Sequence, residues 1–343
     1  MKQTILKYET LAASNSPIGF QETLDTAKRI NERTNGEVQV EVYGVGELVP
    51  ESKIFHAVAS GQLDMAYTMS AVTPGVLKHS EAVELPLWPS GQAGCAFAKA
   101  VLDKYIRPDM EALGVAPVIY QINCSYDFGY FTAPYYGQLW CKQMYASLED
   151  AKGARIFAEN EGIGAAVKAI GMTPVIMSYH EAYTALKENL IDGALMSPIT
   201  PLWLKLQEIV RCCVKIDYPA SGDDFTIMNK KTYDSLSADL RNIIIEEFKK
   251  WQMSPSLDRL PLTKQGWDVW NAMAKAGSFE IIELAPGEKA WCKQQWEQKL
   301  VDDWVAKQLA AGFKDAKAYL DDLLDIRDGI LASGVPQYSG EIL

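Results

Sequence analysis

The side chains that most often perform catalysis or bind metals are few in this sequence and show no catalytic spacing. The three histidines, His56, His79 and His180, form neither the H-x-x-x-H nor the H-E-x-x-H pattern of a zinc site. The sequence contains no G-x-S-x-G nucleophile motif, no G-x-x-x-x-G-K-[ST] phosphate loop and no G-x-G-x-x-G dinucleotide fingerprint. The carboxylates are scattered over predicted helix surfaces. We therefore predict that the protein is not an enzyme and needs neither a metal nor a cofactor.

The cysteines do not form a metal site either, because none of them has C-x2-C spacing. The six are Cys95, Cys124, Cys141, Cys212, Cys213 and Cys292. We interpret them as buried free thiols that pack as small hydrophobic side chains. The alternative is a single disulfide, formed in an oxidising compartment.

The composition indicates a globular protein that does not bind nucleic acid. A length of 343 residues is typical of about two domains, and 48% of the residues are hydrophobic. The net charge of −11 disfavours nucleic acids and anionic membrane surfaces, which it would repel. No apolar run approaches the roughly 20 residues of a membrane-spanning helix. The chain opens on a predicted strand without a signal peptide, and we expect that a signal has been removed.

Helical and extended patterns alternate along the chain, which is typical of an α/β fold with largely parallel sheets. The predicted strands cover residues 5–11, 38–42, 63–67, 154–158, 174–177 and 190–197, and the predicted helices between them include 20–34 and 51–60. After Tyr233 the pattern is almost wholly helical, with helices expected over 235–277, 288–311 and 316–333. A helix of that length can brace two lobes.

Two segments, Ala57–Ala66 and Ala185–Ala194, align with one another without a gap. Each is the end of a helix, a tight stop and a strand that opens on an aspartate, Asp64 or Asp192. One interpretation is a coincidence between two helix-to-strand units that follow the same local rules. The other is a protein of two similar lobes.

Several segments between residues 34 and 193 match, in order and spacing, the motifs of one family. They are Thr34–Tyr43 (T-N-G-E-V-Q-V-E-V-Y), Gly61–Met65 (G-Q-L-D-M), Glu149–Gly153 (E-D-A-K-G), Ala169–Val175 (A-I-G-M-T-P-V) and Glu181–Lys187 (E-A-Y-T-A-L-K). The chain thereby resembles the substrate-binding proteins of tripartite ATP-independent periplasmic (TRAP) transporters.

The resemblance implies a type II-like periplasmic-binding-protein fold, with two α/β lobes joined by crossover strands and a long bracing helix. On that basis we expect residues 1–124 with 215–250 to form the first lobe. Residues 125–214 with 251–343 would form the second lobe and a helical tail. The implied function is capture of a small organic acid between the lobes, with hinge closure and delivery to a TRAP membrane permease. The implied location is the periplasm, and a monomer is expected.

The position that relatives use to bind a carboxylate differs in this sequence. In relatives an arginine ends the motif K-G-x-K-I-R, whereas Lys152–Phe157 reads K-G-A-R-I-F. Phe157 therefore takes the place of that arginine, and Arg155 lies two residues before it, on the same side of the predicted strand. In one hypothesis Arg155 binds the acid and Phe157 stacks on an apolar or aromatic ligand body. In the other, Arg155 is a surface charge at the strand edge and the ligand is not a simple carboxylate.

Aromatic and small polar residues supply the remaining candidate contacts. The expected ligand-binding residues, besides Arg155 and Phe157, are Asn15, Tyr67, Ser70, Trp88, Tyr130, Met196, Ser197 and Tyr218. Asp223 and Asp224 would favour a cationic or zwitterionic ligand if either faced it, but a surface position is the simpler interpretation. The alternatives to an organic acid are therefore a neutral, zwitterionic or cationic ligand, or a sensor-type role for the same clamp.

Overall fold

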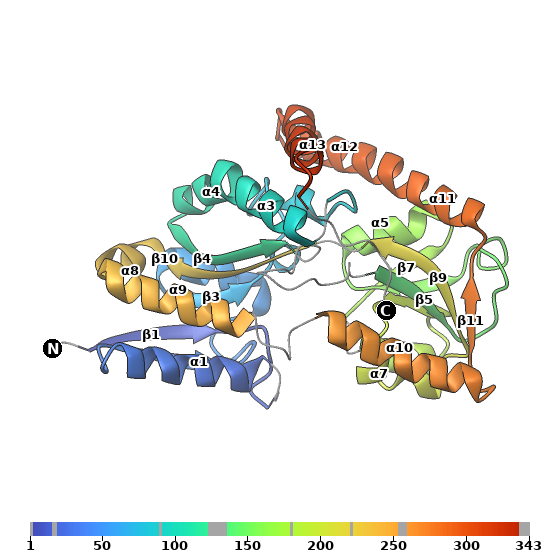
Figure 1. The fold of residues 1–343 in the computed structure, drawn as a ribbon, viewed down its shortest axis with the longest axis horizontal. Coiled ribbons are helices and arrows are strands. Elements are labelled where there is room, and N and C mark those ends of the chain that lie inside the picture. Colours follow the sequence, from blue (N-terminus) through green and yellow to red (C-terminus); the bar gives the residue numbers. More distant parts are fainter. Residues whose placement is uncertain are drawn as a thin grey trace.

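The computed structural model describes residues 3–15, 19–88, 91–122, 136–178, 181–219, 222–252 and 259–335. The described chain forms two lobes, each built around its own twisted β-sheet with helices on both faces (Figure 1). The α/β class expected from the alternating sequence pattern is confirmed.

The first lobe contains a five-stranded sheet in the order β2-β1-β3-β10-β4. Its strands are β1 (Thr4–Glu9), β2 (Val38–Tyr43), β3 (Met65–Thr68), β4 (Val115–Ile122) and β10 (Asp223–Asn229). Strands β1, β2 and β3 are parallel, and β10 is antiparallel to both of its neighbours. One face packs on α1 (Phe20–Arg33) and α9 (Ala238–Gln252), and the other packs on α2 (Ile54–Ser60) and α3 (Gly91–Val101). Two shorter helices, α4 (Arg107–Ala112) and α8 (Lys230–Ser235), complete the lobe.

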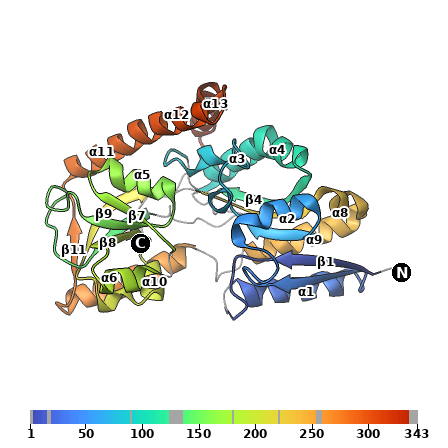
Figure 2. The ribbon, with the colours of Figure 1, turned by 180° about the vertical axis from the view of Figure 1, so that it is seen from behind.

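The second lobe contains a six-stranded sheet in the order β11-β9-β5-β8-β6-β7. Its strands are β5 (Tyr136–Cys141), β6 (Arg155–Ala158), β7 (Thr173–Ile176), β8 (Gly193–Met196), β9 (Cys212–Pro219) and β11 (Glu280–Glu283). One face packs on α6 (Ala182–Lys187), α7 (Thr200–Trp203) and α10 (Arg259–Lys275), and α5 (Glu161–Ala169) lies on the opposite face (Figure 2).

The chain passes between the lobes after β4, after β9 and after α9. Strand β9 belongs wholly to the second sheet, so the sequence division at residue 215 falls inside it. The return to the first lobe lies between Pro219 and Asp223. Local sequence patterns show that a strand is present, but the sheet that it joins depends on long-range pairing.

The C-terminal helices connect the two lobes from outside. Helix α11 (Pro286–Gln295) continues through a π-helical turn, Trp296–Leu300, into α12 (Val301–Ala310), and α13 (Ala316–Ala332) follows. The Trp296 indole donates a hydrogen bond to the carbonyl of Ala166 in the second lobe (3.1 Å). At the other end, α13 packs on α3, and the Tyr319 hydroxyl donates to the carbonyl of His79 in the first lobe. The helices expected over 288–311 and 316–333 therefore form the brace (Figure 1).

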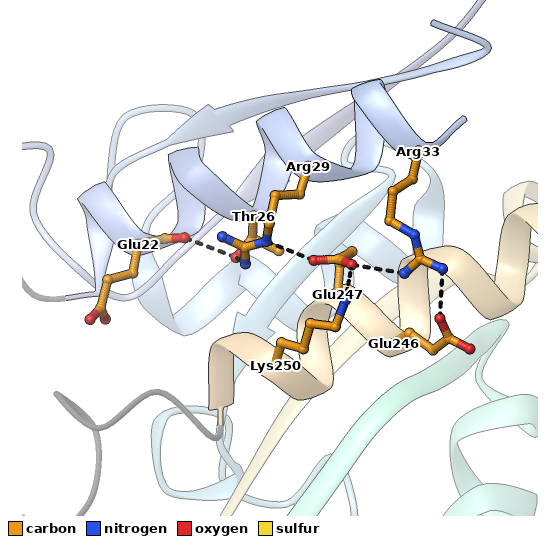
Figure 3. A network of polar contacts seen from close by, with 7 residues as sticks. All are labelled: Glu22, Thr26, Arg29, Arg33, Glu246, Glu247 and Lys250. Carbon is orange, nitrogen blue, oxygen red and sulfur yellow. Dashed lines mark hydrogen bonds and ion pairs between the residues drawn. The ribbon is translucent and has the colours of Figure 1, made fainter. Parts of the chain in front are cut away.

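A buried charged network fixes α9 against α1 (Figure 3). The Glu247 carboxylate is fully buried and accepts hydrogen bonds from Arg29 and Arg33 of α1, both at 2.7 Å. Lys250, one turn later on α9, donates a third at 2.6 Å. Burial alone would raise the pKa of Glu247, but these three hydrogen bonds outweigh it and lower the pKa to about 2. The carboxylate is therefore ionised and paired at neutral pH.

The two segments that align in the sequence also make the same contacts in the two lobes. In the first lobe the Asp64 carboxylate accepts from the amide of Lys7 (2.9 Å), and the Asp64 amide donates to the Lys7 carbonyl (3.1 Å). In the second lobe Asp192 makes the same pair of bonds with Arg155, at 2.9 and 2.7 Å. Each aspartate therefore ties the start of one parallel strand to its neighbour. This equivalence favours two similar lobes over a coincidence of local patterns.

Candidate functional site

The segments that cross between the lobes connect one end of the first sheet with one end of the second sheet. We call the region formed by these two sheet ends the lobe junction. On the first sheet, Ile122 at the end of β4 pairs with Asp223 at the start of β10, and β3 ends beside them. On the second sheet, Tyr136 at the start of β5 pairs with Pro219 at the end of β9. The parallel strands β3 and β8 both run toward this junction. Ligands of α/β proteins bind at the carboxyl ends of parallel strands, so the junction is the candidate site.

The first lobe contributes a buried polar cluster to the junction. The Asp223 carboxylate accepts hydrogen bonds from the hydroxyls of Ser70 and Ser80, and from the amide of Ser70 (3.2 Å). All three residues are buried. The surface position expected for Asp223 and Asp224 is wrong, because each is only 2% exposed. These positions read as polar loop residues in the sequence, but β10 lies between two other strands and is buried along its length.

A second carboxylate, Glu84, lies next to this cluster. The Ser70 hydroxyl is 3.4 Å from Glu84 Oε1. Burial raises the pKa of Glu84 to about 7, with a further contribution from the charge of Glu81, while Ser70 and Lys307 oppose the shift. Burial also raises the pKa of Asp223, and the nearby Glu84 charge adds to this increase against the hydrogen bonds from Ser70. The cluster therefore retains a proton at or near neutral pH.

Glu84 also lies against the second lobe. A β-carbon placed on Gly162 would be 3.5 Å from Glu84 Oε2 and 3.3 Å from Asn160 Oδ1. Gly162 lies in the first turn of α5, where the Asn160 side chain caps the helix by accepting from the amide of Ile163 (2.9 Å). The glycine leaves space for the glutamate, so the two lobes approach closely at this point.

The second lobe places Met196, Ser197 and Tyr218 at the junction end of its sheet. Met196 is buried, and its carbonyl accepts a hydrogen bond from the Trp140 indole (2.9 Å). The hydroxyl of Ser197 is 2.8 Å from that of Thr200. Tyr218 is buried edge-on against Trp296, with ring centroids 4.9 Å apart. Burial raises the pKa of Tyr218, so its hydroxyl stays protonated.

The expected aromatic contacts of the first lobe are held by other rings. Trp88 stacks on Phe97 with centroids 4.9 Å apart, and its indole donates to the Ala82 carbonyl (3.0 Å). Tyr67 packs edge-on against Trp251 at 5.3 Å, on the sheet face that carries α1 and α9. Ser70 lies on the opposite side of the sheet from Tyr67, so the structure does not bring these two expected residues together.

Arg155 lies at the start of β6, the end of the strand away from the junction. Its guanidinium forms a bidentate ion pair with Asp192, with Nε–Oδ2 and Nη2–Oδ1 distances of 3.0 and 2.7 Å. The side chain is 43% exposed. Phe157 is 1% exposed and packs in the core cluster that contains Trp140 and Ala182. This placement favours the hypothesis in which Arg155 is a strand-edge charge.

The remaining expected contacts lie outside this cluster or outside the described residues. Asn15 is exposed in the turn after β1, and Tyr130 lies outside the described residues. Sequence reasoning did not identify Ser80 or Glu84 as site residues. The residues around Glu84 in the sequence gave no signal of a binding role.

Among the described residues, no histidine lies beside the serine hydroxyls of this cluster. His56 is exposed on α2, and Nδ1 of His79 contacts Asp109 Oδ2 (2.6 Å) rather than a serine. His180 lies outside the described residues. The arrangement can hold a ligand by hydrogen bonds and by charge, and it offers no histidine-activated hydroxyl within the described part of the chain.

Comparison with known proteins gives the family. The model described as bacterial extracellular solute-binding protein, family 7, matches residues 9–308. The chain belongs to this family. A curated relative, the C4-dicarboxylate-binding periplasmic protein DctP of Rhodobacter capsulatus, is 24% identical over 324 residues, covering 90% of this chain and 88% of the relative. The resemblance to TRAP substrate-binding proteins is therefore confirmed, and the family is one of transporter solute-binding proteins.

Solved structures confirm the two-lobed type II-like fold. A TRAP periplasmic solute-binding protein from Desulfovibrio salexigens aligns with a TM-score of 0.74 and 21% identity, covering 99% of this chain and 98% of that chain. A marine metagenome TRAP solute-binding protein, described as specific for aromatic acid ligands, aligns with a TM-score of 0.74 and 20% identity, covering 96% and 99%. Among the described residues, no helix combines the length and apolar character needed to cross a membrane.

Proposed function

We propose that this protein is the extracytoplasmic solute receptor of a TRAP transporter and delivers a small organic acid to a membrane permease. The observation that carries the proposal is the family match over residues 9–308, on a chain whose two lobes meet at the carboxyl ends of parallel strands. The lobes are joined by crossing segments and by an outer helical brace, an arrangement suited to hinge closure around a ligand.

The proposed ligand has an aromatic or apolar body. This proposal rests on the metagenome relative, which is described as specific for aromatic acids. Met196 and Tyr218 lie at the junction end of the second sheet, but each is buried in a different core cluster. We propose that the acid group is held by hydroxyl and backbone donors near Ser197. Arg155 is not assigned to the ligand, because its guanidinium is paired with Asp192 at the other end of the strand.

A second candidate ligand is a zwitterion, an acid that also carries an ammonium or another N–H donor. The buried carboxylate of Asp223 and the partly buried carboxylate of Glu84 favour it, since a cationic group would compensate the loss of water around both. The protein would then recognise the acid end of the ligand with one set of groups and the cationic end with Asp223 and Glu84.

Thermal denaturation with four matched probes separates these candidates. Benzoate and phenylacetate carry an acid alone, phenylalanine carries both charges and phenylethylamine carries only the cation. A ligand present at 100 times its dissociation constant stabilises the folded state by about 2.7 kcal/mol, which raises the melting temperature by several degrees. A response to the two acids alone supports the first candidate, and a response to phenylalanine alone supports the zwitterion. If none of the four probes raises the melting temperature, both ligand classes are refuted.

A pair of serine variants then locates the site. Ser197→Ala should weaken binding of the responding probe, while Ser333→Ala, at an exposed position on the C-terminal helix, should leave its dissociation constant unchanged. If both variants bind the probe with the same dissociation constant as the unaltered chain, Ser197 is not a ligand contact. We also propose that the protein acts in the periplasm as a monomer, which light scattering of the purified chain would test.

A further inference from the structure

Two cysteines face each other at the end of the second sheet that lies away from the lobe junction. Cys141 is the last residue of β5 and Cys212 the first of β9, and the two are direct partners in the antiparallel pairing. Directly opposed residues of antiparallel strands have Cα atoms about 4.5 or 5.5 Å apart. Both values lie within the range of about 4.4–6.8 Å that a disulfide spans. The backbone therefore already has the spacing that a cross-strand disulfide requires.

The two thiols are also oriented toward one another. Both side chains are fully buried in the same hydrophobic cluster, so they lie on the same face of the sheet. The Cys212 thiol donates to the carbonyl oxygen of Gln143 (3.3 Å). The adjacent Cys141 side chain lowers the pKa of Cys212, whereas interaction with Cys212 and burial raise the pKa of Cys141. Cys212 is therefore the better nucleophile of the pair.

The neighbouring cysteine shows that the geometry is specific. Cys213 lies opposite Trp140 and packs in the cluster on the other face of the sheet, so its side chain points away from Cys141. Cys292 lies on α11 and Cys95 on α3, and neither is in a strand of this sheet. Among the described cysteines, the Cys141–Cys212 pair alone occupies directly opposed strand positions.

We propose that Cys141 and Cys212 are an oxidation site and form a cross-strand disulfide in the mature extracytoplasmic protein. The family to which the chain belongs is extracellular, and disulfides form and persist in that environment. The oxidant is a disulfide, either of a thiol–disulfide oxidoreductase or of a small molecule such as oxidised glutathione. Because both sulfurs are buried in the folded protein, the exchange takes place while this lobe is still folding.

The exchange proceeds in two balanced steps. The Cys212 thiolate attacks one sulfur of the donor disulfide, forms a mixed disulfide and expels the other donor sulfur as a thiolate. The Cys141 thiolate, whose proton has passed to solvent, then attacks the Cys212 sulfur and expels the second donor thiolate. The two cysteines lose two protons and two electrons in total, and the donor disulfide is reduced to two thiols.

The disulfide would stabilise the second lobe without altering the junction. It closes a loop that contains β6, β7, β8, α5 and α6, and a loop of this length restricts the unfolded chain strongly. Its position at the start of β9 is at the opposite end of that strand from Tyr218 and the crossing to β10. We therefore expect a higher melting temperature and an unchanged ligand dissociation constant.

The test uses the full chain with Cys95, Cys124, Cys213 and Cys292 replaced by serine, refolded with oxidised glutathione. The expected product has lost the mass of two hydrogen atoms, yields one linked pair of peptides containing Cys141 and Cys212, and melts several degrees higher before reduction than after it. The matched control carries Cys212→Ser and keeps Cys213 in its place, so Cys141 and Cys213 are its only cysteines. It should form no intramolecular disulfide, and its melting temperature should not change on reduction.

The unaltered chain provides a second measurement that does not depend on how the variants fold. Non-reducing chymotryptic digestion separates Cys141 from Cys124, because several aromatic residues lie between them. Fragmentation of the linked peptide then distinguishes Cys212 from Cys213. A Cys141–Cys212 link supports the proposal. Complete alkylation of both thiols after oxidative refolding, or a link to Cys213, overturns it.

Discussion

Glu84 lies where a charge is costly, and glutamine would replace its carboxylate with a neutral group of nearly the same shape. The Glu84→Gln variant retains an oxygen that can accept from the Ser70 hydroxyl, now 3.4 Å from Oε1. It removes the repulsion with Asp223 and Glu81 and the cost of burying an ionised group. The variant should therefore be more stable than the unaltered protein at every pH at which Glu84 is ionised in the unfolded chain.

The size of this effect follows from the two pKa values of the carboxyl group. The pKa is 4.5 in the unfolded chain and about 7 in the folded protein, a difference of about 2.5 units. Between these values the unfolded chain has lost the proton while the folded protein keeps it, so stability falls as the pH rises. At about 1.4 kcal/mol per unit, the deficit reaches about 3 kcal/mol above pH 7. Below pH 4.5 both states are protonated and the deficit disappears.

Urea unfolding at a series of pH values measures this directly. The stability difference between Glu84→Gln and the unaltered chain should increase by about 3 kcal/mol from pH 4.5 to pH 7.5. Glu111→Gln, at an exposed position on α4, removes the same charge and should show a difference that stays constant with pH. A difference for Glu84→Gln that is equally constant would refute the assignment of a buried, proton-retaining carboxyl at the junction.

Two further substitutions test the charged contacts elsewhere. Arg155→Ala should lower the free energy of unfolding only slightly, because a solvent-screened ion pair is lost, and it should leave ligand affinity measured by calorimetry unchanged. A loss of affinity at unchanged stability would instead place Arg155 at the ligand. Glu247→Gln should cost about 3 kcal/mol at neutral pH, because Arg29, Arg33 and Lys250 lose their buried partner. The folded pKa of Glu247 is lowered to about 2, so its stabilisation is present above pH 4.5 and is lost as the pH falls toward 2. The variant should lack this acid-dependent loss in urea unfolding, whereas Glu246→Gln on the exposed side should retain it.

The sequence predicted local elements well because their signals are local. The helix at 20–34, the strand at 38–42 and the strand at 154–158 each appear within a few residues of the predicted bounds. Gly36 and Gly171, which follow the ends of α1 and α5, have φ values of 79° and 89°, which only glycine adopts readily. These features depend on periodicity and on backbone conformation, and both can be read within about ten residues.

The site was less predictable because it depends on which strand ends meet. The pattern of β6 placed Arg155 and Phe157 in one strand, but it could not show that Arg155 is at the end away from the junction. Asp223 reads as a polar turn residue, and only the central position of β10 between β3 and β4 explains its burial. Glu84 has no local signal of its own, since the groups that raise its pKa come from η3 (Glu81–Glu84) and from burial by distant elements.

The two aligned segments, Ala57–Ala66 and Ala185–Ala194, nevertheless contain information about the site that single local patterns do not. Asp64 and Asp192 each clamp the start of a parallel strand to its neighbour, at Lys7 and Arg155. Because parallel strands share a direction, fixing their starts at one end of the sheet sends the residues after each strand to the other end. Ser70 follows β3 and Ser197 follows β8, so both serines reach the junction from equivalent units in the two lobes. The basic residue paired with each aspartate is therefore expected at the end of its sheet away from the ligand, and this is the physical reason for not assigning Arg155 to it.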